Sequence, residues 1–324
     1  MITILNGDCR DVLKTMADQS VHCCVTSPPY FGLRDYGHGG QIGLEPTPDE
    51  FVNELVQVFR EVRRVLRDDG TLWLNLGDSY AGSGKGRWAD GNSYATGKQA
   101  THKGTTEGKL VKAVTPDCKP KDLIGIPWMV AFALRADGWY LRQDIIWHKP
   151  NPMPESVTDR CTKAHEYIFL FSKSPKYYFD AKAIMEDAVY GREHANKTTS
   201  WGTNRKHPNK KNVSDYAFKG ENSTCHKDEN GKFVKNKRSV WTVTTKPFKG
   251  AHFATFPPDL IEPCILAGCP EGGTVLDPFG GSGTTGLVSH QHKRNCILIE
   301  LNPDYVGIAE KRVNVPVQDG LPLI

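Results

Sequence analysis

Gly273-Thr-Val-Leu-Asp277-Pro278-Phe279-Gly280-Gly281-Ser282-Gly283-Thr284-Thr285-Gly286 is the stretch that decides the fold of this 324-residue chain. A short apolar run ends at Asp277 and a glycine-rich segment follows, which predicts a strand, a tight turn and then a helix. Glycines let ligand atoms approach the backbone of such a turn closely. The next apolar run, Cys296 to Ile299, is followed by Glu300. A carboxylate at the tip of a neighbouring strand commonly holds a ribose through its hydroxyls.

The ligand of this turn is either a dinucleotide or a cationic cofactor. Gly281, Gly283 and Gly286 fit the pattern G-x-G-x-x-G, and Glu300 follows Gly281 by 19 residues, so a nicotinamide dinucleotide is a serious alternative. Asp277, however, puts a negative charge ahead of the glycines, where a pyrophosphate would be repelled. A cofactor that has an ammonium and a sulfonium group would be attracted instead. This argument favours S-adenosylmethionine.

Short apolar runs that end in turn residues recur along the chain and alternate with helical patterns. The clearest helix is predicted from Pro48 to Leu66, with Gly70 just beyond its end, and another begins near Pro127 and ends before Gly138. Such alternation predicts an α/β fold, in which helices cover both faces of a mostly parallel sheet. Strands are predicted at 2–5, 21–26, 71–76, 140–147, 167–171, 274–276 and 296–299.

A second motif, Thr26-Ser27-Pro28-Pro29-Tyr30, follows the apolar run that begins at Val21. Two prolines fix the backbone, so carbonyl groups can project rigidly from the strand end. The exocyclic amine of cytosine or adenine is a poor nucleophile and needs acceptors for its two hydrogens. The Ser27 hydroxyl and the Pro28 carbonyl can accept them, while Tyr30 offers a face for a base rotated out of its stack. An isolated S-P-P-Y is more often a structural turn with a packing tyrosine, but its coupling to the glycine turn favours the catalytic interpretation, because both motifs lie at the carboxyl ends of predicted parallel strands.

Two stretches, 82–121 and 191–237, interrupt the alternation with polar, glycine-rich sequence and are predicted to be insertions. Residues 191–250 contain 14 Lys and Arg against 5 Asp and Glu, a net charge of +9, which leaves −5 for the rest of the chain. The segment can be a solvated loop or a surface that tracks phosphates. We take Lys206, Lys210 and Lys211 as candidate DNA-binding residues.

The bulk composition, 38% hydrophobic and 24% charged, is that of an ordinary soluble enzyme. No apolar run is long enough to span a bilayer and the start does not resemble a signal peptide, so we expect a cytoplasmic protein without a membrane partner. Nine cysteines without a C-x-x-C pair predict neither disulfides nor a metal site. Cys264 follows a proline, as the nucleophile of cytosine-C5 methyltransferases does, but Ile265 stands where glutamine is needed, and a buried thiol is expected.

At its two motifs the chain resembles the amino-methyltransferases of DNA, which have a [DNS]-P-P-[YFW] catalytic turn and a D-P-F-x-G-S-G-T-T cofactor turn. Residues 277–285 match the second pattern, with Gly280 at the free position. The catalytic turn comes first, as in the circularly permuted β group of that family. Residues 165–167 are also similar to the strand preceding the family's late hairpin. The resemblance covers roughly two thirds of the chain and excludes both insertions.

This resemblance implies a Rossmann-like, seven-stranded methyltransferase sheet whose last hairpin is antiparallel, in one catalytic domain whose insertions recognise the target. It implies that Glu300 holds the ribose and that Asp8 lies near the adenine amino group of S-adenosylmethionine. The catalytic residues would be Ser27, Pro28, Pro29 and Tyr30, and the methionine portion would be held by Asp277, Pro278, Phe279, Gly281, Ser282, Gly283, Thr284 and Thr285.

The expected reaction is methylation of a flipped base in double-stranded DNA, as in restriction–modification, with S-adenosylmethionine as cofactor. A serine that opens the turn favours N4 of cytosine over N6 of adenine. The alternatives are methylation of RNA or of a protein amide, an NAD-dependent oxidoreductase, and a DNA-binding protein without catalysis. The oligomeric state stays open between monomer and homodimer. Pro263 falls inside the helix that Pro257 and Pro258 begin, where we expect a bend.

Overall fold

The computed structural model describes residues 1–33, 40–81, 117–188, 225–227, 230–245 and 256–313. The chain forms two compact units, one made of residues 1–179 with 239–324 and the other of residues 180–238. The first unit contains both sequence motifs. A single catalytic domain with two insertions stays a prediction.

An eight-stranded sheet forms the centre of the first unit, in the order β1-β11-β10-β2-β3-β5-β4-β9. Neighbouring strands run parallel from β1 to β3, whereas β5 is antiparallel to both of its neighbours. The mostly parallel sheet with an antiparallel late hairpin is therefore confirmed. The strands are β1 (Ile2–Asn6), β2 (Val21–Thr26), β3 (Leu66–Leu76), β4 (Tyr140–His148), β5 (His165–Ser172), β9 (Val240–Thr242), β10 (Thr274–Asp277) and β11 (Asn295–Glu300).

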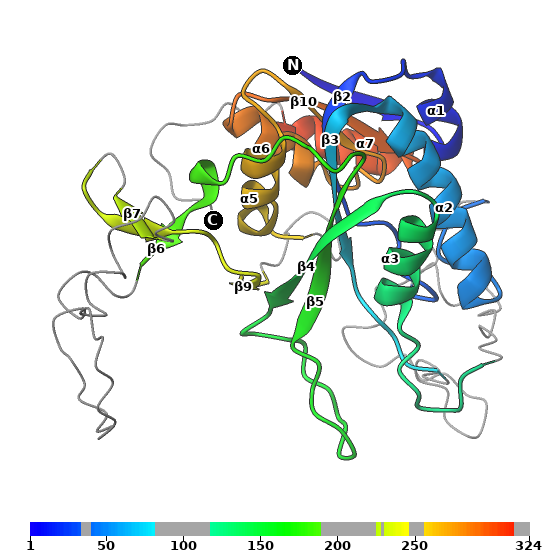
Figure 1. The fold of residues 1–324 in the computed structure, drawn as a ribbon. Coiled ribbons are helices and arrows are strands. Elements are labelled where there is room, and N and C mark those ends of the chain that lie inside the picture. Colours follow the sequence, from blue (N-terminus) through cyan, green and yellow to red (C-terminus); the bar gives the residue numbers. More distant parts are fainter. Residues whose placement is uncertain (34–39, 82–116, 189–224, 228–229, 246–255, 314–324) are drawn as a thin grey trace, which may run out of the picture. The chain divides into compact units, whose positions relative to one another are not determined.

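Helices cover both faces of this sheet. Helix α2 contacts both α1 and α3, and α6 contacts both α5 and α7. Figure 1 shows α2 and α3 on one side of the strands and α5 and α6 on the other. The central strands β2 and β10 are largely buried between these two layers, which explains why their sequences are mostly apolar. The helices are α1 (Cys9–Thr15), α2 (Pro48–Val65), α3 (Ile126–Ala136), α5 (Pro258–Gly268), α6 (Thr284–Gln291) and α7 (Pro303–Val313).

Local sequence explains where α2 begins and which face it buries. Thr47 and Glu50 form a capping box, and Pro48 occupies the first turn, where its missing N–H costs nothing. Phe51 and Phe59 are fully buried on the apolar face and pack into the main core. The helix therefore presses its apolar stripe against the sheet, as predicted.

Three details differ from the sequence prediction. The strand β3 begins at Leu66, directly after α2, so Gly70 lies inside a strand and does not end the helix. Residues 165–172 form the second strand of the antiparallel hairpin, not a strand ahead of it, because β5 pairs between β3 and β4. The three-residue strand β9 pairs with β4 and adds an eighth strand to the seven expected. Pairing with distant segments, which local sequence does not encode, decides all three.

The helix α5 includes Pro263 in its interior. A proline there removes one helical hydrogen bond, at a cost of about 3 kcal/mol in an exposed helix. The buried neighbours Leu260, Cys264 and Ile265 pack this helix into the interior of the unit. The Cys264 thiol is confirmed as buried, and the bend at Pro263 stays a prediction.

The carboxyl ends of the parallel strands bring the two motifs together. Leu276 of β10 pairs with Cys24 of β2, so the residues that follow each strand emerge next to each other. Strand β11 pairs with β10 on its other side and ends at Glu300. Ligands bind at this edge in doubly wound sheets.

The second unit contains a three-stranded antiparallel sheet of β6 (Glu186–Asp187), β8 (Phe233–Lys235) and β7 (Cys225–Lys227). A short 3₁₀ helix covers Lys182–Ile184. Strands β7 and β8 lie in the stretch 191–237 that was expected to be irregular. Phe233-Val234-Lys235 alternates in burial, with Val234 inward, so part of this insertion has regular structure.

No helix in the described part of the chain is long and apolar enough to cross a membrane.

We predict that Gly283→Ala destabilises the protein more than Gly272→Ala does. Both glycines have a left-handed backbone, with φ of +80° and +76°, where a side chain costs about 1–2 kcal/mol. A Cβ at Gly283 would also lie 2.9 Å from Ala309 Cβ of α7, whereas nothing lies within 4 Å of one at Gly272. Overpacking against Ala309 should therefore lower the free energy of unfolding of Gly283→Ala by about 1–3 kcal/mol more than that of Gly272→Ala.

Urea unfolding of both variants measures the difference between their free energies of unfolding. The cost of a side chain at a left-handed φ is common to both variants, so the difference reports the contact with Ala309. Equal losses of unfolding free energy would show that α7 yields to the added methyl group and does not constrain the turn.

Candidate functional site

A cleft lies at the carboxyl edge of the sheet, where β1, β2, β10 and β11 end. Both sequence motifs line it, with the turn after β2 on one wall and the turn after β10 on the other. Helix α7 adds Tyr305 and Ile308. The residues that line it include Asp8, Ser27, Pro28, Pro29, Tyr30, Asp277, Pro278, Phe279, Gly281, Ser282, Thr284 and Glu300.

The Asp277 carboxylate joins the two turns. One of its oxygens accepts hydrogen bonds from Thr26 Oγ1 at 2.7 Å and from the Phe279 N–H at 3.1 Å, and the other accepts one from Thr285 Oγ1 at 2.6 Å. Only 1% of Asp277 is exposed. Burial raises the pKa of this carboxyl to about 6, although the three hydrogen bonds oppose that shift. Thr26 immediately precedes Ser27, so the carboxylate fixes the start of the catalytic turn against the cofactor turn.

Glycines shape the cofactor turn, and Arg312 supports it from α7. Gly281 has φ of +50°, and a Cβ placed there would meet only Phe279 O at 3.9 Å, so this part of the turn is open toward a ligand. The Arg312 guanidinium donates to Ser282 Oγ at 2.8 Å and to Thr284 Oγ1 at 2.9 Å. Burial lowers the pKa of Arg312, but an arginine stays charged at neutral pH.

Glu300 is the last residue of β11 and points its carboxylate at the same turn. Its two oxygens accept hydrogen bonds from the backbone N–H groups of Gly281 and Asn302, each at 2.8 Å. These two hydrogen bonds orient the Glu300 carboxylate. Glu300 lines the cleft beside Ile299 and Leu301.

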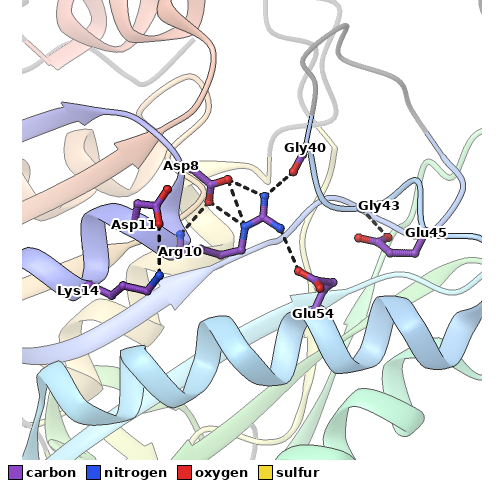
Figure 2. A network of polar contacts seen from close by, with 8 residues as sticks. All are labelled: Asp8, Arg10, Asp11, Lys14, Gly40, Gly43, Glu45 and Glu54. Atoms are coloured by element: carbon purple, nitrogen blue, oxygen red, sulfur yellow. Dashed lines mark hydrogen bonds and ion pairs between the residues drawn. The ribbon is translucent and has the colours of Figure 1, made fainter.

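Asp8 lies at the opposite end of the predicted cofactor site and pairs with Arg10, as Figure 2 shows. Arg10 Nη2 donates to Asp8 Oδ2 at 2.6 Å and to the Gly40 carbonyl at 2.5 Å, while its Nη1 donates to Glu54 Oε2 at 3.0 Å. Burial of Asp8 opposes ionisation, but the hydrogen bonds from Arg10 outweigh it and lower the pKa of Asp8. One guanidinium thus connects α1, α2 and the loop after the catalytic turn.

Tyr30 ends the catalytic turn, and its hydroxyl is fixed by partners on β3 and β5. It donates to Glu166 Oε2 at 2.7 Å and contacts Asn75 Oδ1 at 3.2 Å. The ring also lies against the backbone beyond β3, because a Cβ at Gly77 would be 2.5 Å from Tyr30 Cε2. The tyrosine is therefore held both at its backbone and at its tip.

The structure brings most of the sequence-predicted residues to one cleft, but two of them do not line it. Gly283 packs against α7, and Thr285 is buried with its hydroxyl on Asp277. The three candidate DNA-binding residues, Lys206, Lys210 and Lys211, lie outside the described residues.

Sequence reasoning missed several residues of the site. Arg10, Gln41, Phe256 and Asn302 line the cleft, and Glu166 reaches Tyr30 from a strand whose role had not been assigned. Arg10 could have been suspected because it lies two residues after Asp8. Nothing local connects Glu166 with Tyr30, which are 136 residues apart.

Comparison with known proteins identifies relatives along nearly the whole chain. The family model N6_N4_Mtase, described as DNA methylase, matches residues 21–311. The type II methyltransferase M.Cfr9I of Citrobacter freundii is 47% identical over 311 residues, which cover 96% of this chain and 87% of that protein. The type II methyltransferase M.SmaI of Serratia marcescens is 45% identical over 310 residues, with 96% and 90% covered.

Solved structures share the fold at low sequence identity. The PvuII DNA methyltransferase, described as cytosine-N4-specific, has a TM-score of 0.63 and 18% identity, with 99% of this chain and 88% of that chain covered. The Thermus thermophilus protein TTHA0409, complexed with S-adenosyl-L-methionine, has a TM-score of 0.56 and 22% identity, with 98% of each chain covered.

We predict that Arg10→Lys speeds amide hydrogen exchange at Gly43, whose N–H donates to Glu45 in the loop that Arg10 holds at the Gly40 carbonyl, because one ammonium cannot reproduce a planar fork that binds Asp8, Glu54 and Gly40 together. Exchange measured by mass spectrometry on the peptide that contains Gly40 to Gly43 tests this. Glu54→Gln is the matched control, since it removes one charged partner and leaves the bond from Arg10 to Gly40. Unchanged exchange in Arg10→Lys would show that the loop is held by other contacts.

Proposed function

This chain belongs to the N6/N4 DNA methylase family, and we propose that it transfers a methyl group from S-adenosylmethionine to N4 of a cytosine in double-stranded DNA. DNA methyltransferase activity follows from the family. The observation that supports the proposed site is the buried Asp277 carboxylate, which bonds to Thr26 and Thr285 at once and so places the two turns side by side in one cleft.

The chemistry of the cleft fits this cofactor. The bare backbone at Gly281 and the hydroxyls of Ser282 and Thr284 offer small polar contacts for an amino acid portion, and the charge of Asp277 suits its cations. Glu300, whose carboxylate is oriented by two backbone N–H groups, is proposed to hold the ribose hydroxyls, and Asp8, which lines the same cleft, is proposed to accept from the adenine amino group. When bound, the cofactor supplies a methyl group on a positively charged sulfur.

The catalytic turn activates the amine by accepting its hydrogens. Ser27 Oγ and the Pro28 carbonyl provide two acceptors on a backbone that Pro28 and Pro29 make rigid. With its hydrogens held there, the amine nitrogen turns tetrahedral and directs its lone pair toward the methyl carbon. Tyr30, which lines the same cleft, provides the stacking face for a base that has left the duplex.

The cysteine-nucleophile route used for C5 methylation finds no support in Cys264. Its thiol is fully buried in α5 and donates to the Leu260 carbonyl at 3.8 Å, and it does not belong to the lining of the cleft. Transfer to an exocyclic amine needs no covalent bond between enzyme and base, which agrees with a site built from acceptors.

Cytosine is favoured over adenine because Ser27 opens the turn. A serine in that position resembles the N4-cytosine members of the family, whereas aspartate resembles the adenine members. Serine is also a neutral, shorter acceptor, so it depends on close placement of the amine. Methylation of N6 of adenine is the second candidate, because both bases present an amino group beside a ring nitrogen.

Mass spectrometry of nucleosides from methylated double-stranded DNA tests the product. We expect N4-methylcytosine, with the labelled methyl group derived from labelled S-adenosylmethionine. N6-methyladenine as the sole product would contradict cytosine as the target base but would agree with transfer to an exocyclic amine. A product of 5-methylcytosine would contradict the proposed transfer to an exocyclic amine and, with it, N4 of cytosine as the target. Single-stranded DNA and RNA of the same sequence are the matched controls for the polymer.

We predict that affinity for S-adenosylmethionine rises with pH between pH 5 and 7. Burial raises the pKa of Asp277 to about 6 from its usual 3.8, so the anion that attracts the cationic cofactor forms as the pH passes 6. The gain should approach about tenfold if only the ionised form binds well. Protonation of Asp277 also stabilises the folded state, because its pKa is higher there than in the unfolded chain. This contribution to the free energy of unfolding is fully present below pH 4 and is lost as the pH rises through 6.

Calorimetric titration at both pH values measures this effect. S-adenosylhomocysteine, which lacks the sulfonium charge, should show a smaller dependence, and Asp277→Asn should abolish it. An equally steep pH dependence in Asp277→Asn would assign the titration to another group.

The segment 191–250, which has a net charge of +9, is proposed to supply much of the affinity for the DNA backbone. Changing Lys206, Lys210 and Lys211 together to Gln should weaken binding to all sequences alike and flatten the salt dependence by about 0.9 in slope for each lost phosphate contact. Binding isotherms at several salt concentrations measure the slope. A change in sequence preference at constant slope would instead indicate that these lysines read bases.

A further inference from the structure

We propose that Glu166, held in place by Lys149, is a positioning residue that fixes the ring of Tyr30 for stacking on the target base. The inference rests on the proposed function, in which Tyr30 stacks on a base rotated out of the duplex. It assigns a role in that step to the antiparallel hairpin of β4 and β5, which neither motif includes.

The hydroxyl of Tyr30 ends on a charged acceptor. It donates to Glu166 Oε2 at 2.7 Å, and hydrogen bonds to ionised acceptors are about twice as strong as bonds between neutral groups. Asn75 completes the contact, because its amide nitrogen donates to the Tyr167 carbonyl at 3.0 Å while its oxygen lies 3.2 Å from Tyr30 Oη. The tip of the tyrosine is therefore bonded to both β3 and β5.

Lys149 holds the carboxylate that receives this bond. Its ammonium is paired with Glu166 Oε1, whereas Glu166 Oε2 accepts from Tyr30 and, at the longer distance of 3.4 Å, from the Asn75 amide. The exposed fractions of the two side chains are only 18% and 16%, so solvent screens the pair weakly. The same ammonium lies 4.1 Å from the centre of the Trp147 ring. Trp147 is opposite Glu166 in the register of β4 and β5, which places all three side chains at one end of the hairpin.

Gly77 limits where the ring can lie. A methyl group there would overlap the ring edge at 2.5 Å, so the absence of a side chain lets the tyrosine rest on the backbone that follows β3. With the backbone fixed by two prolines, the edge by Gly77 and the hydroxyl by Glu166, the ring plane has little freedom. A stacking face that is already oriented avoids ordering costs when the base arrives.

A double-mutant cycle between Glu166→Ala and Tyr30→Phe tests this role. The phenylalanine keeps the stacking face and loses only the hydroxyl. If Glu166 acts through that hydroxyl, Glu166→Ala should lower the single-turnover rate of methyl transfer by about 10- to 100-fold, the range expected from loss of a hydrogen bond to a charged group. In the Tyr30→Phe background the same change should cost less than about threefold.

Three further measurements separate positioning from general damage. The dissociation constant for S-adenosylmethionine should stay unchanged in every variant, because the cofactor turn is not touched. Glu166→Gln should recover much of the rate, since its carbonyl can still accept from Tyr30. Glu155→Ala is the matched control, because Glu155 forms an ion pair with Arg160 between the same two strands and should leave the rate unaltered.

Additive losses in the cycle, or an unchanged rate in Glu166→Ala, would overturn the proposal, as would a loss of cofactor affinity equal to the loss of rate. A wild-type protein that methylates no amino group of DNA would instead contradict the proposed function itself. The two failures are distinct, because the cycle is read only on DNA that the wild-type enzyme methylates.

Discussion

A buried carboxylate between two turns is the interaction on which the rest of the site depends. Asp277 is the last residue of β10, and its oxygens accept hydrogen bonds from the hydroxyls of Thr26 on β2 and Thr285 on α6. Burial of an ionisable group is costly unless hydrogen bonds satisfy it, and three are present here. The remaining cost appears as a pKa raised to about 6. In the proposed function the same charge also attracts the cationic cofactor, so that one group would both join the turns and set the electrostatics of the cleft.

Polar anchors from outside the two motifs support each wall of the cleft. Arg10 connects Asp8 with the loop at Gly40 on one side, and Arg312 supports the cofactor turn from α7. At the turn after β2, Glu166 accepts a hydrogen bond from the hydroxyl of Tyr30. Each anchor belongs to an element packed on the sheet, which holds the turns more precisely than loops could hold themselves.

Local sequence was sufficient for seven strands of the large sheet, for the helices α2 and α3, and for the motif residues that touch the cleft. The apolar runs of β2 and β10 and the glycine turn after Asp277 are short-range signals, and the structure contains all of them. The start of β3 at Leu66 and the addition of β9 were not predicted, because pairing with distant strands decides them. Strands β7 and β8 were missed for the same reason, since each is three residues long and has little pattern of its own.

Short patterns in the sequence predicted the groups that the proposed reaction uses: an acceptor turn at Ser27 and Pro28, a glycine turn preceded by Asp277, and a carboxylate at Glu300. These follow from residue type and spacing within a few positions. Only the tertiary structure decided which partners hold them. Asp277 and Thr26 are 251 residues apart, and Tyr30 and Glu166 are 136 apart. Their contact results from the order of strands in the sheet, and strand order depends on packing of the whole chain, which no local pattern contains.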